Sequence, residues 1–83
     1  MEQRIGKITH FYNRISVAVL ELTDELKIGD EIHILGRVTD FTQQVASLEV
    51  EHKKIPLAGP GMEIALKVDD YVRAGDEVFK VVG

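Results

Sequence analysis

The chain has 83 residues and a mass of 9.3 kDa, which leaves room for one compact domain with a small core. It has no cysteine, so disulfides, thiolate metal ligands and cysteine nucleophiles are excluded, and no apolar run approaches the roughly 20 residues that span a bilayer. The net charge of −4 argues against strong non-specific nucleic-acid binding, and the polar N-terminus indicates a cytoplasmic protein with no membrane contact.

Short runs rich in isoleucine and valine, separated by turn signals, are typical of an all-β chain. We predict six strands and no helix, at residues 4–10, 15–22, 31–35, 38–50, 62–68 and 77–82. The second strand is apolar on both faces, which indicates a strand that is covered on both sides or packed at the seam of a barrel. The fourth is predicted to be long and bent, because its apolar positions change face between Val45 and Leu48, and such a change requires a bulge.

Two segments of the chain share one pattern. Residues 26–32 and residues 72–78 both read apolar, basic, small or apolar, Gly, Asp, Glu, apolar, and both lead into a predicted strand. Gly29 and Gly75 can take a positive φ at little cost, and Asp30 and Asp76 can bond to backbone amides of a turn. We interpret these four residues as structural turn positions and not as a paired catalytic site.

The motifs that catalysis requires are missing or incomplete. There is no phosphate-binding glycine loop and no dinucleotide fingerprint, since Gly59 and Gly61 supply only a fragment of one. The serines lie inside predicted strands without elbow glycines, and the three histidines are far apart in sequence. We therefore predict no enzyme activity, no catalytic residue, no cofactor and no metal site.

A small group of basic and aromatic residues is the candidate partner-binding or RNA-binding surface. His52, Lys53 and Lys54 are the densest basic spot, and Arg37 adds to it if the turns converge. Phe11 and Tyr12 could stack on a nucleic-acid base. The alternatives are that the basic residues form an ordinary solvated surface and that the aromatic pair packs as a lid over one end of the fold.

Several stretches, taken in order, resemble a known superfamily of β-barrels. They are IGKITHFY at residues 5–12, ISVAV at 15–19, LKIGDEIHILG at 26–36, FTQQVASLEV at 41–50 and VRAGDEV at 72–78. They are similar to the β-barrel second domain of translational GTPases, such as elongation factor Tu and initiation factor two. They are similar also to a barrel module at the C-terminus of collagenase-like peptidases.

The resemblance implies a closed, six-stranded barrel of the translation-protein, Greek-key-like type, with residues 1–83 as a single domain. It also implies a binding platform, because hydrolysis in those factors belongs to a separate GTPase domain. Asp30 and Asp76 match the turn positions of the superfamily. The chain lacks the Gly-Arg-Gly-Thr strand with which elongation factor Tu receives the aminoacyl end of transfer RNA, so no aminoacyl-binding residue is carried over.

Two functions follow from this resemblance. The first is a non-catalytic, stand-alone binding module related to translation, which contacts a protein or ribonucleoprotein partner, with RNA possible and no DNA expected. The second is an accessory module that holds the substrate of a separately encoded collagenase-like peptidase or docks its catalytic chain.

Overall fold

Ten β-strands and no helix make up the regular structure of residues 1–82, the part of the chain that the computed structural model describes. The longer strands are β1 (Glu2–Tyr12), β2 (Val17–Leu22), β4 (Glu31–Leu35), β5 (Asp40–Gln44), β9 (Glu63–Lys67) and β10 (Glu77–Val81). The two-residue strands are β3 (Leu26–Lys27), β6 (Glu49–Val50), β7 (Lys53–Lys54) and β8 (Leu57–Ala58). The predicted all-β class is confirmed. No helix in this part of the chain is long and apolar enough to cross a membrane.

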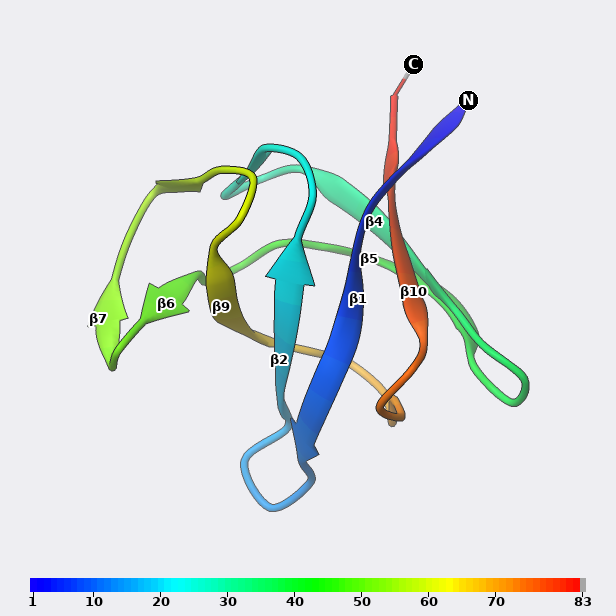
Figure 1. The fold of residues 1–83 in the computed structure, drawn as a ribbon. Coiled ribbons are helices and arrows are strands. Elements are labelled where there is room, and N and C mark those ends of the chain that lie inside the picture. The colour runs from blue at the N-terminus through cyan, green and yellow to red at the C-terminus, as the bar shows by residue number, and fades with distance from the viewer. Residues whose placement is uncertain (83) are drawn as a thin grey trace.

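Eight strands form one curved antiparallel sheet in the order β5-β4-β10-β1-β2-β9-β6-β7, and β3 pairs with β8 in a second, small sheet. In Figure 1, β7 lies at the left of the view and the turn between β4 and β5 lies at the right. The closed ring of six strands is therefore not confirmed, because the backbone pairing of residues 1–82 leaves β5 and β7 as edges.

A side chain joins β5 to the end of β9 where no backbone ladder does. The amide nitrogen of Gln43 donates to the carbonyl oxygen of Lys67 at 2.9 Å, and the amide oxygen of Gln43 accepts from the backbone N–H of Asp69 at 2.7 Å. Gln43 is only 7% exposed. A buried glutamine thus bonds to two backbone groups at the end of β9, and it connects the two parts of the sheet beside the core.

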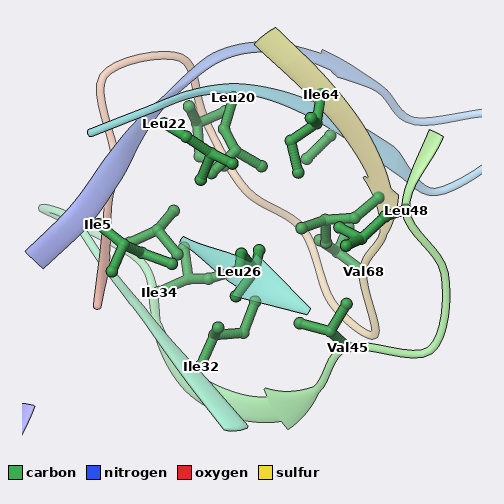
Figure 2. Packing of buried hydrophobic residues seen from close by; sticks show 14 of the residues in the cluster. Ile5, Leu20, Leu22, Leu26, Ile32, Ile34, Val45, Leu48, Ile64 and Val68 are labelled. Atoms are coloured by element: carbon green, nitrogen blue, oxygen red, sulfur yellow. The ribbon is translucent and has the colours of Figure 1, made fainter. Parts of the chain in front are cut away.

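The inner face of the sheet carries the core. On β2, Ala18, Leu20 and Leu22 are buried, and on β9 the same is true of Ile64 and Leu66, which is the alternation expected of strands with one covered face. Figure 2 shows these side chains meeting others from β1, β3, β4 and the loops between strands. The labelled members of this cluster are Ile5, Leu20, Leu22, Leu26, Ile32, Ile34, Val45, Leu48, Ile64 and Val68.

The prediction of one bent strand over residues 38–50 is wrong. Val45 and Leu48 are both buried, as the change of face requires, but the chain leaves the sheet between β5 and β6 and does not bulge. Backbone bonding to the β4 side of the sheet continues one residue past Gln44 before the chain turns away. The N–H of Val45 donates to the carbonyl of Asp30 at 2.8 Å, and the carbonyl of Val45 accepts from the N–H of Gly29 at 2.9 Å. The register irregularities lie in β1 instead.

The two similar segments form turns with the same internal hydrogen bonds. Asp30 N–H donates to the carbonyl of Lys27, and the carboxylate of Asp30 accepts the N–H of Lys27 at 3.1 Å. Asp76 makes the same pair of bonds with Arg73, and there the carboxylate contact is 2.8 Å. Gly29 and Gly75 have φ values of 94° and 100°, a conformation that glycine adopts easily.

These turns relate the two halves of the fold. The N–H of Gly29 bonds to Val45, the N–H of Gly75 bonds to Ile8, and each contacted residue donates back to the aspartate of its turn. The turns lead into β4 and β10, which pair antiparallel with His33 opposite Phe79, the residues that directly follow the two segments. The two similar segments therefore occupy corresponding places at the starts of two paired strands.

Candidate binding groove on the outer face of β2 and β9

The outer face of β2 and β9 carries a groove that the chain leaves open. Val17 and Val19 alternate with the buried residues of β2 and therefore lie on the outer face, opposite Lys67 and Ala65 of β9. Val17, Val19 and Ala65 are only half-buried, and they form the floor of a groove of about 1000 Å³. Met62 from the start of β9 and Val50 from β6 extend its apolar lining.

Two turns border the groove. The turn between β1 and β2 contributes Tyr12 and Ile15, which are 51% and 60% exposed. The turn between β6 and β7 contributes Glu51 and His52. Two turns from different parts of the chain therefore contribute to the lining of the groove.

The turn between β6 and β7 has an unfavourable backbone for its residues. Val50 pairs with Lys53, so Glu51 and His52 form a two-residue hairpin loop, and their φ values are 51° and 67°. Loops with this conformation favour Asn-Gly, because a larger side chain in the left-handed region costs about 1–2 kcal/mol. The chain thus carries a glutamate and a histidine at the rim of the groove where another pair would fold at lower cost.

The groove is mainly acidic. Three glutamates line it: Glu49, Glu51 and Glu63. The lysine and histidine in its lining are Lys67 and His52. Glu21 on β2 lies directly opposite Glu63, a placement of like charges that disfavours the pairing of the two strands. Among residues 1–82, these four carboxylates take part in none of the ion pairs. On the neighbouring strands, Lys7 lies opposite Glu21 and Lys54 lies opposite Glu49. Glu63 faces Glu21 and Glu51 is in the turn, so these two carboxylates are the ones available to a cationic ligand.

The six residues predicted as one surface lie in different places. Tyr12 and His52 line the groove, and Lys53 and Lys54 follow on the exposed edge strand β7. Phe11 is half-buried, packs on the core and contacts Tyr71 edge-on, with ring centroids 5.6 Å apart.

Arg37 lies apart from the other five. It is in the turn between β4 and β5, in a shallow hollow that it shares with Arg73. In Figure 1 this turn is at the opposite side of the view from β7. The turns therefore do not converge as the combined surface would require.

The floor of the groove is made of residues outside the candidate surface: Val17, Val19, Ala65 and Met62. The pattern of the second strand holds a signal for it. That strand is apolar on both faces, and its outer face remains open in the described structure and is not covered by another part of the fold.

The three histidines lie on different elements, and residues 1–82 contain no group of three or more His, Asp or Glu side chains placed to hold a metal ion. His10 is in β1 and His52 is at the groove. His33, on β4, lies between two carboxylates: its Nδ1 is 2.9 Å from both carboxylate oxygens of Glu2, and its Nε2 is 2.5 Å from Asp40. The hydrogen bond to Asp40, and then the bond to Glu2, raise the pKa of His33, although partial burial opposes the shift.

The raised pKa of His33 gives an expected pH dependence of stability. Below the unfolded-state pKa of about 6.5, the imidazolium and its two carboxylate partners stabilise the folded chain fully. As the pH rises through the higher folded-state pKa, the proton is lost and this contribution to the free energy of unfolding disappears. Urea denaturation at a series of pH values should show that decline, and H33Q should flatten it. An equal decline in both proteins would contradict the assignment.

The chain resembles parts of peptidases in sequence. It is 40% identical over 76 residues to an uncharacterised protease of Methanocaldococcus jannaschii, a match that covers 90% of this chain and 19% of that protein. It is 33% identical over 78 residues to a collagenase of Porphyromonas gingivalis, a match that covers 92% of this chain and 22% of the collagenase. The chain thus spans about a fifth of the length of the curated relatives it matches. No protein-family model matches the chain.

The fold resembles that of a solved peptidase fragment. The C-terminal domain of a protein named as a U32 peptidase of Geobacillus thermoleovorans superposes with a TM-score of 0.90, at 18% identity, over 96% of this chain and 93% of that one. The selenomethionine form of the same domain gives a TM-score of 0.87 over 92% and 96% of the two chains. These likenesses favour the second of the two functions drawn from the sequence, and they give no support to a role in translation.

Proposed function

We propose that this domain is a non-catalytic accessory module of a collagenase-like peptidase. The observation that carries the proposal is the extent of the sequence match, which includes nearly all of this chain but only about a fifth of each relative. Such a match is what a single module of a larger protein produces. The structural likeness to a peptidase C-terminal domain supports the same assignment at the level of the fold.

The groove supports a binding role better than a catalytic one. It offers an apolar floor with charged groups at its rim, which is the usual composition of a binding site. Ser47 and His52 both line it, yet the side-chain hydrogen bonds of residues 1–82 join neither to the other nor to an orienting acid. The contact with RNA through Lys53 and Lys54 stays a prediction, and the carboxylates beside these lysines would repel phosphate.

A chimeric collagenase tests the proposal. The segment of the Porphyromonas gingivalis collagenase that matches this chain is deleted in one variant and replaced by this chain in another. If the domain assists the peptidase, we expect the deletion to slow cleavage of denatured collagen about tenfold or more, because a tethered binding module raises the effective substrate concentration. The replacement should restore most of that rate.

Two results would overturn the assignment. Full activity of the deletion variant would show that the segment assists nothing, and a replacement as slow as the deletion would show that this chain cannot serve in its place. A short fluorogenic peptide serves as the control substrate, since its cleavage should change little in either variant if the catalytic part is intact.

A further inference from the structure

We propose that the groove over β2 and β9 binds one extended segment of the peptidase's polypeptide substrate, and that this segment carries apolar side chains and a basic side chain. The source of the polypeptide rests on the proposed function. The chemistry of the segment rests on the groove itself.

The shape of the groove favours a single extended chain. Its floor follows β9 from Glu63 to Lys67, which corresponds to a length of about 13 Å, or about four residues of an extended peptide. The turn that holds Tyr12 and Ile15 and the turn that holds Glu51 and His52 border this floor. An extended segment along β9 would contact the floor and the side chains of both turns at once.

The lining suits apolar side chains of varied shape. Val17, Val19 and Ala65 form the floor, and the small side chain of Ala65, opposite Val19, leaves space above the sheet. Met62 can adapt its side chain to different partners, and Tyr12 offers an exposed ring of the kind that holds extended, proline-rich peptides. The groove therefore selects for apolar character in its ligand more than for one residue type.

The charges select a basic group and disfavour nucleic acid. Glu49, Glu51 and Glu63 line the groove, and Glu21 lies across from Glu63. Lys7 lies opposite Glu21 and Lys54 opposite Glu49, but none of the four carboxylates is in an ion pair within residues 1–82. A lysine or arginine of the bound segment would relieve the repulsion between these carboxylates. A phosphate backbone would increase it.

The strained turn is consistent with a binding role for its side chains. Glu51 and His52 occupy left-handed positions where Asn-Gly would be more stable, and both side chains line the groove. We expect the replacement of Glu51 and His52 by Asn and Gly to raise the melting temperature of the domain and at the same time to weaken ligand binding.

Peptide binding to the isolated chain tests this inference, with fluorescence anisotropy as the readout. The probe is a short labelled peptide of alternating valine and arginine, and its counterpart has glutamate in place of arginine. We expect the arginine peptide to bind about tenfold more tightly or better, with a difference that shrinks as the salt concentration rises.

The double variant E51K/E63K should lose this preference. The control E25K/E31K makes the same change in net charge at exposed positions outside the groove, and it should keep the preference.

The outcomes separate this inference from the proposed function. Equal losses in E51K/E63K and E25K/E31K would mean that net charge alone attracts the peptide, and the groove assignment would be overturned. Unchanged affinity in the Asn-Gly variant would remove Glu51 and His52 from the site and overturn the contact proposed for them. If the chimeric collagenase is active but the peptide does not bind the groove, only the inference fails. If the peptide binds but the chimera is as slow as the deletion, the proposed function fails together with the peptidase substrate as the source of the segment, and the chemistry assigned to the groove stands.

Discussion

Replacing Gln43 with leucine is expected to lower the free energy of unfolding by about 2–4 kcal/mol. The leucine keeps most of the buried volume but removes the two hydrogen bonds that join β5 to the end of β9. The carbonyl of Lys67 and the N–H of Asp69 would lose these partners close to the core. Both bonds are part-buried, and a buried backbone group left unsatisfied costs about 1–3 kcal/mol. Urea denaturation of Q43L measures the loss.

The neighbouring glutamine provides the control. Gln44 is on the same strand, is exposed and uses only its backbone carbonyl in the contact with Gln43. Q44L should therefore change the free energy of unfolding by no more than about 0.5 kcal/mol. Equal losses in the two variants would show that Gln43 does not hold β5 to β9. Another contact would then have to keep these two strands together.

The second large effect is expected from truncation of the core at Leu20. Leu20 is fully buried near the middle of β2, among the inward-facing side chains that Figure 2 shows. L20A removes three carbons from a packed interior and should cost about 2–5 kcal/mol, since the surrounding side chains relax only partly into the cavity. This is a large part of the total stability of a domain of this size.

Val19 gives a matched comparison on the opposite face of the same strand. Because Val19 lies half-buried at the groove floor, V19A should cost less than about 1 kcal/mol. Denaturation curves of the two variants at the same protein concentration test this difference. A similar cost in both would mean that the outer face of β2 is covered in solution, for example by a second copy of the chain, and the groove would not be free to bind a peptide.

The sequence was most informative where one local rule decides the structure. Residues 31–35 alternate cleanly and form β4 with the predicted bounds, and β9 and β10 each lie within one residue of the predicted ends. The repeated Gly-Asp pattern forms two turns with the same internal hydrogen bonds. Such a turn needs a residue that tolerates a positive φ and a short carboxylate next to it, and both requirements can be read from a few residues.

The sequence was least informative where distant partners compete. After β5 the backbone of Val45 bonds to Gly29 and Asp30, which are distant in sequence, so no local pattern shows where this strand ends. The role of Gln43 depends in the same way on Lys67 and Asp69, which are far away in sequence. The groove could not be predicted for a related reason. The sequence of the second strand shows two apolar faces, but which of them stays open depends on the whole fold.

The most direct measurement is cleavage of denatured collagen by the chimeric collagenase with and without A65R in this domain. Ala65 lies in the middle of the groove floor, opposite Val19, so an arginine there should fill the groove and pair with its carboxylates while leaving the core intact. If the domain holds the substrate in the groove, A65R should slow the cleavage of denatured collagen to the rate of the deletion variant, with cleavage of the short fluorogenic peptide unchanged. A rate for A65R equal to that of the unaltered chimera, with the domain folded, would contradict this account.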